Sequence, residues 1–202
     1  MHAPANLFFL PGALGRTEFW HPAAYLLTCP APKVHMSWPG FSGIPPDPAI
    51  KGIDDLVTRL LAKIDRPSAL IAQSMGGVVA MHAALRRPEL ITHLVLSATS
   101  GGMPMEAFGA EDWRPAVLAG HPGLPDWFIR YRSDLTRELS ALRIPTLLLW
   151  GGADPISPVQ AGRRLASVLP QAELHIIPDG GHDVACAFAS QVAPLIDRHL
   201  AA

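Results

Sequence analysis

The chain has 202 residues, of which 49% are hydrophobic and 16% are charged, and its formal net charge at pH 7 is −1. This length suits a single domain, and the apolar share is ample for a buried core. The near-zero net charge gives no reason to expect a nucleic-acid partner or an anionic membrane surface as partner.

Cys29 and Cys186 are the two cysteines, and their spacing fits no CxxC or metal-binding pattern. We expect both to be free thiols in a reducing compartment. The apolar run at residues 7–10 is too short for a signal peptide, and no window approaches the roughly 18 apolar residues of a membrane span. The sequence therefore predicts a cytoplasmic protein without a membrane span.

Short apolar runs alternate with helical patterns along the chain. In order, the predicted elements are strands at residues 7–10 and 34–38, a helix at 53–64, a strand at 69–72, a helix at 75–85, strands at 94–96 and 146–150, a helix at 158–169, a strand at 174–177 and a helix at 184–200. The apolar runs do not alternate with polar residues, which is typical of strands covered on both faces. Pro194 predicts a kink or a break in the last helix.

This alternation predicts an α/β fold with three layers, in which helices cover both faces of a mostly or entirely parallel sheet of about six strands. We interpret residues 1–202 as a single domain. An insertion at about 101–143 interrupts the pattern, and we expect two short helices and no strand there. At the carboxyl edge of a sheet this insertion would form a cap over a pocket, although an ordinary crossover connection with its own small core is the alternative.

Ser74 lies between a predicted strand and a predicted helix, in the run AQSMGG at residues 72–77. A serine hydroxyl needs a base beside it and an exposed position before it can act as a nucleophile, and a sharp strand-to-helix turn supplies the exposure. Ala72 and Gly76 are small where that turn crowds the backbone. A helix N-cap is the alternative role for this serine. The sequence favours Ser74 as the nucleophile.

Asp154 and His182 follow Ser74 in the chain, each in a glycine-containing loop after a predicted strand. A histidine at this place can act as general base and then as general acid, while a carboxylate fixes its tautomer. Asp179 and Asp183 lie too near His182 in the sequence to reach its far nitrogen easily, so Asp154 is the preferred carboxylate. The alternatives are a solvated loop histidine and a turn aspartate before proline.

An oxyanion hole needs two backbone N–H groups aimed at the developing charge. We expect one from Met75, which follows the nucleophile, and one from Ala13 in the loop after the first strand. Leu14 is a candidate substrate contact beside that loop, with a core position as the alternative. Further candidate contacts lie in the insertion: Met103, Trp113, His121, Trp127 and Phe128.

No pattern for a cofactor or a metal is present in the sequence. There is no HExxH spacing, no GxGxxG after a strand and no GxxxxGK[ST] run. We therefore expect no cofactor and no metal, and a small-molecule substrate as the partner. The sequence does not indicate an oligomeric state.

From about residue 7 to residue 200 the chain resembles the α/β-hydrolase family. Ser74, Asp154 and His182 match its nucleophile, acid and base positions in order, residues 11–20 resemble its oxyanion loop and the helix after it, and residues 39–43 resemble the loop after its fourth strand. The chain differs from the family pattern in four ways: Pro11 stands where the family usually has histidine, Ala72 replaces the first glycine of the turn, the cap is short, and the family's first two strands are expected to be missing.

The overall pattern is similar to small esterases and to the related C–C bond hydrolases and lyases. The sequence thus predicts a serine hydrolase, a carboxylesterase that cleaves an ester or thioester of a small, largely apolar substrate through an acyl-enzyme. One alternative is a C–C bond hydrolase or lyase with the same three residues. A second alternative is a noncatalytic ligand-binding module with this fold.

Overall fold

The computed structural model describes residues 3–121 and 123–202. In these residues six strands form one sheet in the order β2-β1-β3-β4-β5-β6, and every neighbouring pair is parallel. The strands are β1 (Leu7–Leu10), β2 (Lys33–His35), β3 (Ser68–Gln73), β4 (Ile91–Ser97), β5 (Thr146–Gly151) and β6 (Ala172–Ile177). The predicted six-stranded parallel sheet is confirmed.

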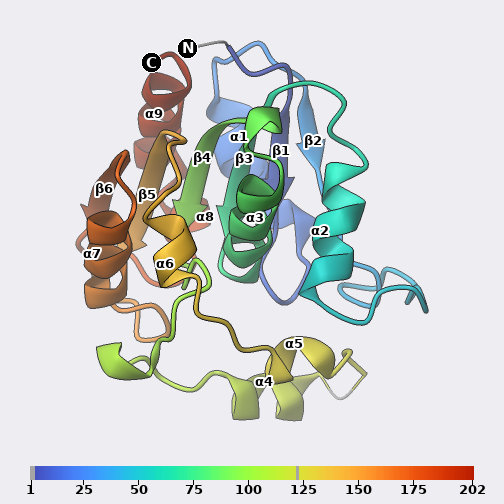
Figure 1. Cartoon of the computed structure of the whole chain (residues 1–202). Coiled ribbons are helices and arrows are strands. Elements are labelled where there is room, and N and C mark those ends of the chain that lie inside the picture. The colour runs from blue at the N-terminus through green and yellow to red at the C-terminus, as the bar shows by residue number, and fades with distance from the viewer. Residues whose placement is uncertain (1–2, 122) are drawn as a thin grey trace.

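Helices cover both faces of this sheet, so the fold has three layers (Figure 1). One face carries α2 (Ile53–Leu61), α3 (Met75–Arg86) and α7 (Val159–Val168). The other carries α1 (His21–Leu26), α8 (Val184–Ala187) and α9 (Ala189–Leu200). Short 3₁₀ turns at Thr17–Trp20 and Pro88–Leu90 precede α1 and β4.

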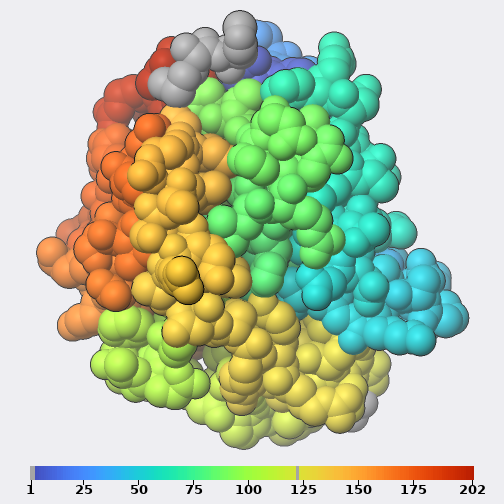
Figure 2. Space-filling model, viewed as in Figure 1, coloured from blue at the N-terminus to red at the C-terminus, as the bar shows by residue number. Residues whose placement is uncertain are grey.

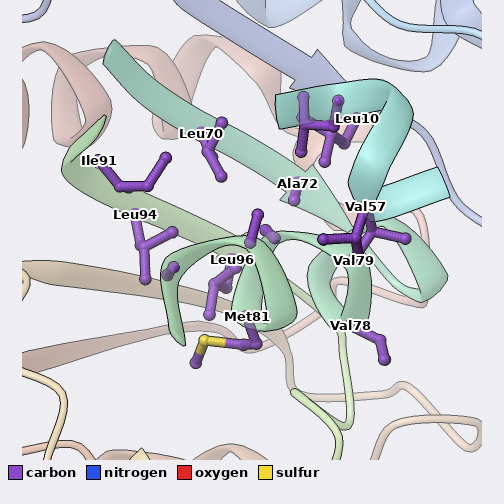
Figure 3. Close-up of a cluster of buried hydrophobic side chains, with 14 of the residues drawn as sticks. Leu10, Val57, Leu70, Ala72, Val78, Val79, Met81, Ile91, Leu94 and Leu96 are labelled. Atoms are coloured by element: carbon purple, nitrogen blue, oxygen red, sulfur yellow. The ribbon is translucent and has the colours of Figure 1, made fainter. Parts of the chain in front are cut away.

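Two apolar clusters fill the space between the sheet and the helices. Leu70, Leu94 and Leu96 point toward α3 on one side of the sheet (Figure 3). Their chain neighbours Ile71 and Val95 belong to the cluster on the other side. Successive side chains of a strand point to opposite faces, so both faces need apolar residues and the strands show no polar alternation.

The last predicted helix breaks at a different place from the one expected. The break lies at Phe188, whose backbone (φ −113°, ψ 36°) is not helical, and α9 continues through Pro194. The proline removes one backbone N–H from the helix. Val192 and Ile196 of the same helix are buried, so packing against the sheet compensates for the missing hydrogen bond.

The insertion at 101–143 contains more helical segments than the two predicted. They are a 3₁₀ turn at Glu106–Phe108, α4 (Arg114–Gly120), α5 (Trp127–Arg130) and α6 (Thr136–Leu139). Gly109 adopts a left-handed conformation (φ 69°) after the 3₁₀ turn, and Pro115 lies in the first turn of α4. Such residues end and start short helices, which is why the segment divides.

The carboxyl ends of the strands all point toward one end of the molecule (Figure 1), and the insertion covers that end in the space-filling view (Figure 2). The C-terminus lies at the opposite end (Figure 1). None of the helices in residues 3–121 and 123–202 is both long enough and apolar enough to cross a membrane.

His93 of β4 is a buried histidine that faces α9. Its exposed fraction is 1%, and neither ring nitrogen has a hydrogen-bond partner among the residues described. The His199 ring packs against it at 5.3 Å between centroids. Burial, reinforced by the neighbouring His199, lowers the pKa of His93 from 6.5 to about 4. The native state therefore holds this imidazole neutral.

The buried His93 predicts a loss of stability in acid. Between pH values of about 6.5 and about 4 the unfolded chain binds a proton that the native state does not, so the free energy of unfolding falls by on the order of 3 kcal/mol as the pH drops. We expect His93→Leu, which cannot titrate, to show a weaker fall. Urea denaturation at about pH 7.5 and about pH 5 measures the difference, and equal falls in both proteins would contradict the prediction.

Candidate active site

Ser74 occupies the sharp turn between β3 and α3. Its backbone (φ 51°, ψ −118°) lies in a region that residues other than glycine rarely adopt. The Ser74 N–H donates to the carbonyl of Ser97 at 3.0 Å, and the Ser74 carbonyl accepts the N–H of Gly77 at 2.9 Å. These bonds hold the strained turn and leave the hydroxyl at the surface of a cavity.

Residue 76 must be small because the turn brings the first part of α3 against the end of β1. A Cβ at residue 76 would lie 2.5 Å from the carbonyl oxygen of Pro11 and 2.8 Å from that of Leu10. Both neighbours are main-chain atoms, which cannot move without displacing the strand. The sequence therefore needs glycine at this position.

His182 lies between Ser74 and Asp154. Its Nε2 is 3.1 Å from the Oγ of Ser74, and its Nδ1 is 2.8 Å from the Oδ2 of Asp154. An ionised carboxylate can only accept a hydrogen bond, so Nδ1 carries the proton and Nε2 accepts the serine O–H. The structure thus brings together the three side chains that the sequence singled out. Asp154, and neither Asp179 nor Asp183, is the carboxylate bonded to this histidine.

The side chain of Asp154 is fully buried and held on both oxygens. Its Oδ1 accepts the backbone N–H groups of Ile156 at 2.9 Å and Ser157 at 3.0 Å, which leaves Oδ2 for the imidazole. Trp150 steadies the same loop, because its indole N–H donates to the carbonyl of Ser157 at 2.8 Å. The carboxylate therefore has one orientation.

The loops after β5 and β6 lie in direct backbone contact. A Cβ at Gly151 would collide with the carbonyl oxygens of Gly180 and Gly181, and Ala153 N–H donates to the Gly180 carbonyl at 2.9 Å. Glycine at these positions allows the approach that places Asp154 beside His182. Gly151, Gly152 and Gly180 are crowded in this way, whereas a Cβ at Gly181 would meet its neighbour at an ordinary contact distance.

Two buried tryptophans fix the start of the loop after β1. Trp20 donates its indole N–H to the carbonyl of Leu10 at 3.0 Å, and Trp38 donates to the carbonyl of Pro11 at 3.1 Å. Ala13, farther along this loop, lines the same cavity as Ser74. Local sequence patterns do not connect these indoles with the loop, because the hydrogen bonds span 10 and 27 residues.

A cavity of about 700 Å³ opens beside Ser74 and His182, between the sheet edge and the insertion. Of the predicted substrate contacts, the structure places Met103, Trp113 and Phe128 in its lining, together with Ala13 and Met75 of the predicted oxyanion donors. Further apolar side chains in the lining, which sequence reasoning missed, are Val78, Met105 and Ile156.

Leu14, His121 and Trp127 are not among the residues that line this cavity. Trp127 instead packs edge-on against Phe41 and Phe128, with centroids 5.8 Å and 6.1 Å apart. It supports the wall from behind because the α5 helix presents Phe128, and not Trp127, to the interior. Periodicity cannot decide this in a helix of four residues.

A polar contact ties the insertion to α3. His82 Nε2 lies 2.5 Å from the hydroxyl of Tyr131, and Tyr131 lines the cavity. Burial lowers the pKa of His82, so the ring is held neutral and can share this bond in either tautomer. Through this bond His82 links α3 to the insertion.

The site shows no arrangement for a metal ion. Within the part of the chain that the structure describes, no three His, Cys, Asp or Glu side chains gather closely enough to hold one.

Comparison with known proteins identifies the class. A profile of the alpha/beta hydrolase family matches residues 7–142, and a second profile, of the alpha/beta hydrolase fold, matches residues 124–185. The chain belongs to the alpha/beta hydrolase family.

Particular relatives are named as hydrolases. The chain is 28% identical over 180 residues to the uncharacterized hydrolase YugF of Bacillus subtilis, with 67% of this chain and 64% of that protein covered. It is 26% identical over 197 residues to the pimeloyl-[acyl-carrier protein] methyl ester esterase of Nitrosomonas europaea, with 75% and 78% covered. The solved structure of a thermophilic esterase from Thermogutta terrifontis superposes with a TM-score of 0.78 at 19% identity, over 99% of this chain and 90% of that one.

Gly76→Ala tests the close approach of α3 to β1. The added Cβ must displace main-chain carbonyls, so we expect the free energy of unfolding to fall by about 1–3 kcal/mol in urea denaturation. Gly120→Ala is the matched control, since no atom of the described residues is found within 4 Å of a Cβ there. A Gly76→Ala protein as stable as the control would mean that the turn does not need glycine.

Proposed function

We propose that this chain is a serine hydrolase, a carboxylesterase that cleaves an ester or thioester of a small, largely apolar substrate through an acyl-enzyme. The observation that carries the proposal is the line of hydrogen bonds from Ser74 through His182 to Asp154, at 3.1 Å and 2.8 Å. Each of these side chains comes from a different loop at the carboxyl edge of the sheet. A noncatalytic binding module has no need for such a line.

In the first step the Oγ of Ser74 attacks the carbonyl carbon of the substrate. His182 Nε2 takes the hydroxyl proton as the new C–O bond forms, and the buried Asp154 stabilises the imidazolium that results. The carbonyl π electrons move to the oxygen, giving a tetrahedral oxyanion. His182 then returns the proton to the leaving alcohol or thiol as its bond to carbon breaks.

The backbone N–H groups of Met75 and Ala13 are the proposed donors to that oxyanion. Donors of this kind are most effective when they are fixed in place before charge develops. For Ala13, the tryptophan hydrogen bonds to the carbonyls of Leu10 and Pro11 support a fixed loop. For Met75, the support is its position as the first residue of α3. Each such donor is typically worth about 3 kcal/mol of transition-state stabilisation.

Deacylation reverses the sequence with water in place of the alcohol. His182 removes a proton from water, the hydroxide oxygen attacks the acyl carbon, and the collapsing intermediate releases the acid while Ser74 recovers its proton. No group beyond this chain and water is required.

Insertion residues 101–143 are proposed to act as the cap of this single domain and to select the substrate. Met103, Trp113 and Phe128 offer apolar walls, which favour an apolar acyl or alcohol group. A volume of about 700 Å³ suits a small molecule. One relative is named as a methyl ester esterase, which supports the cleavage of an ester.

Ser74→Ala should lower the turnover of a p-nitrophenyl ester by at least about a thousandfold, because no other group replaces the nucleophile. The initial rate of p-nitrophenolate release measures this. Ser167→Ala is the matched control, since Ser167 lies exposed on α7 and its hydroxyl donates to the carbonyl of Arg164 at 2.7 Å. Ester hydrolysis retained in Ser74→Ala would rule out the proposed mechanism.

An acyl adduct on Ser74 distinguishes the esterase from other uses of the same residues. Mass spectrometry of an acid-quenched reaction should show the acyl mass on the peptide that contains Ser74. An active enzyme without an adduct would indicate proton transfer, as in a C–C bond hydrolase or lyase. A Ser74 that does not react with a fluorophosphonate probe would indicate a binding module.

A further inference from the structure

Thr99 makes a hydrogen bond to the main chain of the turn between β3 and α3 that carries Ser74. It lies two residues beyond the end of β4, with an exposed fraction of 1%. Its hydroxyl donates to the carbonyl oxygen of Ser74 at 2.6 Å and accepts the N–H of Gly101 at 3.1 Å. A hydroxyl has a single proton to donate, and here that proton goes to Ser74.

The carbonyl that receives this bond shares a peptide unit with the N–H of Met75. A peptide unit is planar and trans, so its carbonyl and its N–H point in opposite directions from one rigid group. A partner that fixes the Ser74 oxygen also fixes the direction of the Met75 N–H. A hydrogen bond to the carbonyl further polarises the amide and strengthens its N–H as a donor, by roughly 10–30%.

The chain is built to bring Thr99 to this carbonyl. Ala98, the residue before it, has a positive φ of 45° although it is not glycine, and it is buried. Gly77 leaves room for the threonine, because a Cβ at residue 77 would lie 2.5–2.7 Å from three Thr99 side-chain atoms. Strain at Ala98 and the missing side chain at Gly77 both serve the contact between Thr99 and the turn.

We propose that Thr99 is a positioning residue that orients and polarises the Met75 N–H, and so prepares the oxyanion hole. This inference rests on the proposed function, in which that N–H binds the developing charge. Thr99 does not touch the substrate. It acts through the Ser74–Met75 peptide, from a loop that follows a different strand.

Thr99→Val removes the hydroxyl and keeps the packing against Gly77, and Thr99→Ser restores the hydroxyl. We expect Thr99→Val to lower kcat for a p-nitrophenyl ester by about tenfold, less than the loss of a whole donor, with KM changed by less than about twofold. The backbone ¹⁵N resonance of Met75 should shift in Thr99→Val. Thr99→Ser should recover most of kcat and return the resonance.

Thr146→Val is the matched control. Thr146 is equally buried, and its hydroxyl donates to the carbonyl of Ile144 at 2.9 Å, at the amino end of β5 away from the site. It should lose stability in urea without a fall in kcat or a shift of the Met75 resonance. If Thr99→Val does not fold, Thr99→Ala is compared with Thr99→Ser by the same measurements, because these two variants differ only in the hydroxyl.

An unchanged Met75 resonance in Thr99→Val, or an unchanged kcat, would overturn the proposal, as would a kcat that Thr99→Ser fails to restore. The resonance reports on the peptide whether or not an ester is the substrate. Suppose that the Ser74→Ala variant still hydrolyses the ester and that the Met75 resonance shifts in Thr99→Val. These results would reject the proposed function, but they would still support the control of the Met75 amide by Thr99.

Discussion

The parallel direction of the strands is the constraint on which the site depends. Since every strand runs the same way, the loops after β1, β3, β4, β5 and β6 all leave from one edge of the sheet (Figure 1). That edge collects Ser74, Asp154 and His182 from three loops distant in sequence, and it sets Thr99 beside the first of them. Layers of apolar side chains on both faces of the sheet keep the strands in fixed register. The positions from which the loops start are therefore fixed as well.

Buried polar groups from the core then fix the loops themselves. Three fully buried tryptophans each donate an indole N–H to a main-chain carbonyl at this edge: Trp20 to Leu10, Trp38 to Pro11 and Trp150 to Ser157. Each bond satisfies an indole that would otherwise be costly to bury. The same side chains thus fill the core and hold the backbone around the site, so core packing and the geometry of the site are linked. The Pro11 side chain has no hydrogen-bond donor that could hold the loop after β1. The indole N–H groups of Trp20 and Trp38 hold this loop instead.

Much of this arrangement could be read from the sequence, because it depends on local signals. Apolar runs ended by glycine or proline marked the strands, and small residues around Ser74 marked the turn. The helix break at Phe188, the position of Trp127 behind the cavity wall and the roles of Trp20 and Trp38 could not be read, since each depends on packing between distant segments. Thr99 was missed for the same reason: a threonine after a strand is unremarkable until its hydroxyl is seen 2.6 Å from the Ser74 carbonyl.

The segment over the cavity leaves the sheet after β4 and returns at β5, which are neighbouring strands paired through Ser97 and Leu149. Because β4 and β5 are parallel, the segment leaves at the carboxyl edge of the sheet and returns at the amino edge, so it is a crossover whose length the strand order does not fix. Segments of other lengths can be grafted between the same two strands with Ser74, His182 and Asp154 left in place. Substrate range in a chain built this way can diversify through one exchangeable module while the chemistry stays constant.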